Sequence, residues 1–125
     1  AGAAPGRAAV VAGFDAIAEQ EGALTARLLE FLSSRNSVRL IGRASSGIAE
    51  RVATISFTVG DESSRTVVEA VDKAKVGIRY GDFYARRLVE DHGLTATEGV
   101  VRVSMAHYNT LEEVDRLNRA LEPTL

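Results

Sequence analysis

The chain has 125 residues, of which 46% are hydrophobic and 26% are charged, and its formal net charge is −2. This composition indicates one globular domain with a sizeable core, and the charge gives no basis for binding nucleic acid or an anionic membrane. Cysteine is absent, which excludes disulfides, thiolate metal sites and thiol nucleophiles. No apolar stretch reaches the roughly 20 residues that span a bilayer. We therefore expect a cytoplasmic protein without a nucleic-acid or membrane partner.

The sequence begins with Ala1, and its one methionine is Met105. Removal of an initiator methionine before a small residue explains this beginning, and so does a cut from a longer polypeptide. The head of the chain, residues 1–7, is rich in Gly, Pro and Ala. It predicts either a frayed helix start or a severed connection.

Apolar residues at helical spacing predict a helix over residues 8–19 and a second helix over residues 21–33. Short strands are then expected at 38–42, 52–59, 76–79 and 99–105. The second of these alternates well, with one apolar face and one face of Thr and Ser, which is typical of a strand with one buried side. The apolar face consists of Ala53, Ile55, Phe57 and Val59.

Three further helices are predicted between and after the strands. Ser63 or Ser64 can cap the first, which points Val and Ala side chains inward, and the second runs over residues 84–91 and ends near Gly93. Thr110 and Glu113 have the spacing of a capping box at the start of the last helix. The order of elements predicts an α+β domain: a small, mainly antiparallel sheet with helices packed on one face, preceded by a long helical segment.

Most residues that could carry chemistry are better explained by structure. His92 and His107 lie on different elements, and metal ligation needs clustered donors, so no metal site is predicted. No serine lies in a G-x-S-x-G turn, and no Gly-rich loop of the phosphate-binding kind joins a strand to a helix. Lys73 and Lys75 lie at a predicted helix end, where lysines interact with exposed carbonyls.

Arg102 is the exception. In "VVRVSM" the apolar residues Val101, Val103 and Met105 share one face of the strand, which places Arg102 on the other face. An arginine with apolar neighbours on both sides can hold a carboxylate through two parallel hydrogen bonds. The alternative is an ordinary arginine on the solvated side of a sheet, and the residues alone leave both interpretations open.

The stretch "VRVSMAHYNTLEEVDRLNRAL", residues 101–121, resembles the C-terminal end of the class V aminotransferases and cysteine desulfurases, which are enzymes that depend on pyridoxal phosphate (PLP). "VGIRYGDFYARRL", residues 76–88, resembles the strand and Gly-containing loop of the same family. "TARLLEFLSSRNSVRLIG" and "RVATISFTV" resemble the helix–strand unit and the following strand of its small domain. The resemblance covers nearly the whole chain, in order.

The resemblance implies roles for single residues. Arg102 occupies the position of the arginine that binds the α-carboxylate of the amino-acid substrate, and an active-site rim loop contains Arg79, Tyr80, Gly81 and Tyr84. Tyr84 stands where desulfurases with this loop spacing have the nucleophilic cysteine. Because a phenol cannot carry sulfur as a persulfide, desulfuration by the usual route is not expected.

The resemblance also implies how the chain is organised. Residues 1–20 correspond to the tail of the connection to a missing N-terminal large domain, and residues 21–125 to the small C-terminal domain. The large domain would bind PLP, and the parent enzyme would be a homodimer. This chain would supply no catalytic, cofactor-binding or metal-binding residue, so it would be inactive alone.

Two alternatives from other classes remain at this point. One is a free-standing module that binds an amino acid through Arg102. The other is a structural dimerisation domain that binds no ligand.

Overall fold

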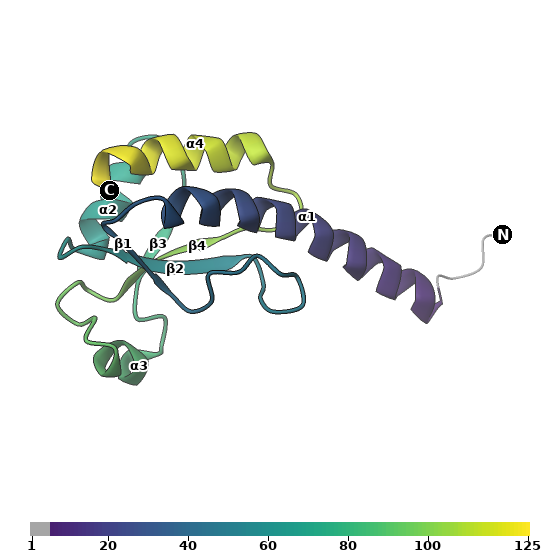
Figure 1. Cartoon of the computed structure of the whole chain (residues 1–125), viewed down its shortest axis with the longest axis horizontal. Coiled ribbons are helices and arrows are strands. Elements are labelled where there is room, and N and C mark those ends of the chain that lie inside the picture. The colour runs from purple at the N-terminus through teal and green to yellow at the C-terminus, as the bar shows by residue number, and fades with distance from the viewer. Residues whose placement is uncertain (1–5) are drawn as a thin grey trace.

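The computed structural model describes residues 6–125 and shows helices and strands in the order α-β-β-α-β-α-β-α (Figure 1). The prediction for the head of the chain falls largely on residues 1–5, outside the described residues. The elements are α1 (Arg7–Ser33), β1 (Val38–Ile41), β2 (Thr54–Val59), α2 (Ser64–Asp72), β3 (Arg79–Gly81), α3 (Arg86–Asp91), β4 (Val100–Ser104), α4 (Leu111–Leu121) and a final 3₁₀ turn (Glu122–Thr124).

The four strands form one antiparallel sheet in the order β1-β2-β4-β3, which confirms the predicted α+β class. Three of the helices, α1, α2 and α4, lie on one face of this sheet (Figure 1). The short α3 lies on the other side, at the end of a loop that folds away from the sheet. The sheet therefore has a fully covered helical face and a second face that is covered only in part.

The core lies between the sheet and the three helices. Ala53, Ile55, Phe57 and Val59 are all buried, as the alternation in the second predicted strand requires. Ile55, Phe57 and Val59 meet leucines of α1 and α4 and valines of α2, in a cluster that includes Leu24, Leu28, Leu32, Val67, Val71, Leu117 and Leu121. The periodicity of the sequence thus identified the core face of each of these elements.

Arg7–Ser33 form one helix, so the predicted division into two helices is wrong. Gly22 lies within α1, but one glycine in a helix costs about 1 kcal/mol relative to alanine and does not end it. An alanine Cβ at this position would lie 2.6 Å from Cγ2 of Ile48, so the glycine allows the loop after β1 to cross the helix closely. Burial in α1 begins at Leu24, and the preceding turns extend beyond the sheet (Figure 1).

Two further boundaries differ from the predictions, one because of strand pairing and one because of backbone conformation. The third strand was expected at 76–79, but pairing with β4 covers only Arg79–Gly81. The third helix was expected from residue 84, but Phe83 and Tyr84 have φ values of 51° and 64°, so a right-handed helix begins only afterwards.

The capping box at the start of α4 is confirmed. The Thr110 hydroxyl accepts a hydrogen bond from the Glu113 amide at 3.2 Å, and the Glu113 carboxylate accepts one from the Thr110 amide at 3.0 Å. Hydrogen bonds from Asn109 and Thr110 lower the pKa of the Glu113 carboxyl. At the N-terminus of α4, the Thr110 and Glu113 amides are therefore both satisfied.

Replacing Thr110 with alanine is expected to destabilise the chain by about 1 kcal/mol, because the Glu113 amide loses its acceptor. Thermal unfolding followed by circular dichroism measures this as a midpoint lower by roughly 4 °C. Thr66, exposed within α2, is the matched control, and Thr66→Ala should leave the midpoint unchanged or slightly higher. Equal losses in both variants would contradict a specific capping role.

Within residues 6–125, no helix is long and apolar enough to cross a membrane.

Candidate functional site

The sheet face opposite the three long helices places two arginines side by side. Arg79 of β3 pairs directly with Arg102 of β4, and Arg102 pairs on its other side with Ser56 of β2. Residues directly opposite each other in an antiparallel pair share a face of the sheet. Like charges in this arrangement destabilise a sheet, so the two guanidinium groups together favour binding of an anion.

Arg102 has no acid partner within the described part of the chain. Among residues 6–125 its side chain forms no ion pair and no hydrogen bond, and its Nε is buried without an acceptor. Its guanidinium carbon lies 3.7 Å from the centre of the Phe83 ring, within the range of a cation–π contact. The ring covers one face of the guanidinium, and the donors in the guanidinium plane remain for a ligand.

A cavity of about 150 Å³ lies beside Arg102, between the sheet and α3. Its walls are mostly apolar and come from β1, β4, the loop before α3 and α3 itself, through residues such as Ile41, Phe83, Leu88, Leu94 and Val100. Arg102, Ser56, Asp82 and His92 contribute the polar groups. The apolar surroundings strengthen any interaction between the guanidinium and an anion, because they lower the local dielectric.

The loop between β3 and α3 is a tight turn with an uncommon backbone. Gly81, Phe83 and Tyr84 all have positive φ values, 128°, 51° and 64°. The carboxylate of Asp82 accepts a hydrogen bond from the Tyr84 amide at 3.0 Å, and its carbonyl accepts one from the Ala85 amide at 2.8 Å. This turn directs Phe83 onto Arg102 and leaves Tyr84 completely exposed, at 106% of its reference area.

The predicted rim residues divide between the two sides of β3. Arg79 lies on the Arg102 side, whereas Tyr80 points toward α2, where Arg65 lies 5.7 Å from the centre of its ring. Gly81 packs against the start of β4 so closely that a Cβ on Gly99 would lie 2.3 Å from the Gly81 carbonyl oxygen. Gly81 and Gly99 thus fix the base of the loop that carries Phe83 and Tyr84.

Phe83 is the neighbour of Arg102 that the sequence did not identify. It is one residue from Tyr84, which was singled out, and 19 positions from Arg102 in the chain. No spacing rule links a loop residue to a strand residue at this separation. The register of β3 on β4, together with the positive φ values of the turn, brings the two side chains together.

Comparison with known proteins places this geometry in a family. The sequence model described as Aminotransferase class-V matches residues 8–117. The chain belongs to the aminotransferase class-V family. This family is one of PLP-dependent enzymes, and the match confirms the resemblance that residues 76–88 and 101–121 indicated.

Relatives of this class V chain have names from both branches of the resemblance. It is 49% identical, over 113 residues, to the aminotransferase-like protein FGM3 of Gibberella zeae, a match that covers 90% of this chain and 28% of that protein. It is 41% identical, over 105 residues, to the cysteine desulfurase-like protein ustD of Aspergillus flavus, covering 82% of this chain and 24% of that protein. The chain thus spans about a quarter of the length of these relatives.

A solved structure gives the same fold. The apo structure of a cysteine desulfurase from Thermococcus onnurineus NA1 superimposes on this class V chain with a TM-score of 0.79 and 26% identity. The match covers 94% of this chain and 28% of that one. The fold described above is therefore the fold of one part of a larger class V enzyme.

The two lysines of this class V chain lie at the end of α2, apart from the candidate site. The cofactor needs a lysine for its Schiff base, and the chain has two lysines, Lys73 and Lys75. Both are exposed at or just after the end of α2, which packs on the helical face of the sheet, away from Arg102. Within residues 6–125, no group of three or more His, Asp or Glu side chains could hold a metal ion.

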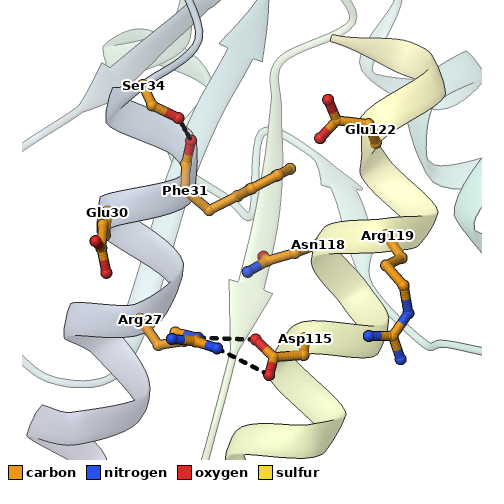
Figure 2. A pocket seen from close by; sticks show the side chains of 8 residues that line it. All are labelled: Arg27, Glu30, Phe31, Ser34, Asp115, Asn118, Arg119 and Glu122. Atoms are coloured by element: carbon orange, nitrogen blue, oxygen red, sulfur yellow. Dashed lines mark hydrogen bonds and ion pairs between the residues drawn. The ribbon is translucent and has the colours of Figure 1, made fainter.

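A wide groove of about 710 Å³ runs between α1 and α4, on the opposite side of the sheet from Arg102 (Figure 2). Arg27 spans it with two hydrogen bonds to Asp115, at 2.8 and 3.0 Å, and these bonds lower the pKa of the Asp115 carboxyl. Asn118 lies between the helices, 9% exposed. The groove is an open junction between two helices that an ion pair ties together, and it is separate from the candidate site.

Proposed function

We propose that this chain is the small C-terminal domain of a PLP-dependent class V enzyme that acts on an amino acid, and that Arg102 binds the substrate carboxylate. The observation that supports the proposal most directly is the environment of the Arg102 guanidinium. The guanidinium is partly buried, it has no acid partner within residues 6–125, and a second arginine, Arg79, lies directly opposite it. A carboxylate would satisfy the in-plane donors of Arg102 and offset the repulsion between the two cations.

In this proposal the catalytic groups come from outside the chain. A preceding large domain would provide the lysine and the remaining contacts to PLP, which supplies an electron sink for the bonds around the substrate α-carbon. Residues 1–20 would belong to the connection between the two domains, residues 21–125 would be the small domain, and the enzyme would be a homodimer. Arg102 would fix the orientation of the substrate, and the loop at 79–86 would form part of the active-site rim.

The absence of cysteine restricts the reaction. Several relatives are named as cysteine desulfurases, but this chain has no thiol, and the fully exposed residue at the tip of its loop is Tyr84. A persulfide cannot form on any of these 125 residues. We therefore propose a transferase or lyase reaction on an amino acid, and a panel of amino acids assayed with the complete enzyme would identify which one.

The isolated chain is expected not to retain PLP. After mixing with the cofactor and gel filtration, the protein fraction should have no visible absorbance from a lysine-bound cofactor, because Lys73 and Lys75 are exposed at or just after the end of α2 and do not line the cavity beside Arg102. The complete enzyme, treated in the same way, should retain about one cofactor per chain. A stable, stoichiometric cofactor absorbance on the 125-residue chain would contradict the proposed division of labour.

The environment of Arg102 also supports one alternative function. A free-standing module that binds an amino acid through Arg102 would also explain an arginine without an acid partner. It requires saturable binding of an amino acid by the 125-residue chain alone, lost on Arg102→Ala. Titration calorimetry on the isolated chain distinguishes the two, since the proposal assigns most contacts with the substrate to the larger enzyme.

A further inference from the structure

Phe83 makes the one aromatic contact to Arg102 in the described part of the chain. The contact is close, 3.7 Å from the guanidinium carbon to the ring centre, and Phe83 is itself partly buried. The backbone that places the ring there is uncommon, because Phe83 is a non-glycine residue with a φ of 51°. The turn that fixes this conformation is closed by Asp82, through its hydrogen bonds to the Tyr84 and Ala85 amides.

The side of the Arg102 guanidinium that Phe83 covers decides whether a carboxylate can still bind to it. A ring stacked on a guanidinium occupies the face of the planar group, whereas a carboxylate binds along its edge through two parallel hydrogen bonds. The two interactions are therefore compatible. No hydrogen bond or ion pair from residues 6–125 holds the guanidinium, so the Phe83 ring, together with the walls of the cavity, is what restricts its rotamers.

We infer that Phe83 is a positioning residue for substrate recognition: its ring holds Arg102 with the edge of the guanidinium available to a carboxylate. The inference rests on the proposed function of Arg102 and adds a residue that acts through it. Because the arginine is already ordered before the carboxylate arrives, less conformational entropy is lost on binding. Phe83 should therefore affect affinity for a carboxylate and leave affinity for an amine unchanged.

The test uses the complete enzyme and two probes that differ in one group. L-alanine has a carboxylate and an amine, and ethylamine has the amine alone. Titration calorimetry gives a dissociation constant for each probe with the wild type and with Phe83→Leu, Phe83→Met and Phe83→Tyr. Leucine and methionine keep apolar volume without a π face, and if one of them fails to fold the other replaces it. Tyrosine keeps the ring and tests rescue.

We expect Phe83→Leu and Phe83→Met to weaken L-alanine binding about tenfold, a loss of the size that a cation–π contact and an ordered side chain provide. Ethylamine should bind all variants equally, and Phe83→Tyr should bind L-alanine like the wild type. A nitrogen–proton spectrum of the 125-residue chain gives a second readout. The Arg102 Nε–H resonance should lose its ring-induced shift in Phe83→Leu and keep it in Phe83→Tyr.

The outcomes separate this inference from the proposed function. If Arg102→Leu weakens L-alanine binding and the Phe83 variants do not, positioning by Phe83 is overturned and the proposed function stands. If no variant, Arg102→Leu included, changes the preference for L-alanine over ethylamine, the proposed function fails, and the inference fails with it. Equal loss of both probes in the Phe83 variants would show a general structural role and would also overturn the inference.

Discussion

Replacing Arg102 with leucine in the complete enzyme is expected to lower kcat/KM for its amino acid by about 10²- to 10³-fold. In the proposed function Arg102 binds the substrate carboxylate, and the size follows from the loss of that partly desolvated, charge-assisted pair of hydrogen bonds, worth roughly 2–5 kcal/mol. Arg102→Lys keeps the charge but loses the planar fork, so it should recover only part of this loss. Steady-state kinetics with the best substrate of the amino-acid panel gives kcat/KM for the wild type, Arg102→Leu and Arg102→Lys.

The control for this prediction is Arg39, which is also a strand arginine, exposed and on β1. Arg39→Leu should leave kcat/KM within about twofold, because Arg39 is exposed and does not line the cavity, although it lies on the same face of the sheet. The isolated chain provides a second control. Since Arg102 has a buried Nε without an acceptor, Arg102→Leu should not lower the stability of the 125-residue chain by more than the cation–π contact, about 1 kcal/mol. A large loss of stability with unchanged kinetics would show that Arg102 is structural.

Replacing Phe57 with alanine is expected to destabilise the chain by about 3–5 kcal/mol. Phe57 is 0% exposed in the central strand β2, between Leu40 of β1 and Val101 of β4. Its removal takes away a large apolar surface and leaves a cavity that the surrounding side chains fill only in part. Domains of this size have a total stability of about 5–15 kcal/mol, so the variant should be close to unfolding, and urea denaturation followed by circular dichroism measures the loss.

The same chemical change at Phe14 provides the control. Phe14 is 67% exposed on the part of α1 that extends beyond the sheet, so Phe14→Ala should change the free energy of unfolding of the isolated chain by less than about 0.5 kcal/mol. Comparable losses at both positions would mean that the core is not centred on β2.

The covered face of the sheet could be predicted from the sequence because it depends on local periodicity. Ile55 and Phe57 alternate with polar residues, and a buried strand face requires this pattern, so burial followed directly from spacing. The capping box of Thr110 and Glu113 was predictable for the same reason, since all its hydrogen bonds join residues within one turn. Of the boundaries that were missed, the limits of β3 depend on pairing with the distant β4, and the start of α3 depends on the positive φ values of Phe83 and Tyr84.

The break predicted within α1 shows a limit of this reasoning. The apolar stripe changes in character near residue 20, because only the turns from Leu24 onward pack against the sheet, while the earlier turns extend past it. Periodicity reports which face is buried and does not report whether the helix continues. A glycine at position 22 was compatible with either outcome, and the helix continued.

The sequence by itself determined the family, the α+β class, the core face of each strand and the position of Arg102 on the opposite face. Each of these depends on residue order and on periods of two or 3.6 residues, which a chain has before it folds. Only the tertiary structure decided that Arg79 lies directly opposite Arg102, that Tyr80 points to the helical face, and that Phe83, rather than Tyr84, contacts the guanidinium. Those contacts depend on strand register and on the positive φ values of one turn. The register is set by hydrogen bonds between residues far apart in the chain, and the φ values are a backbone geometry that side-chain identity does not encode.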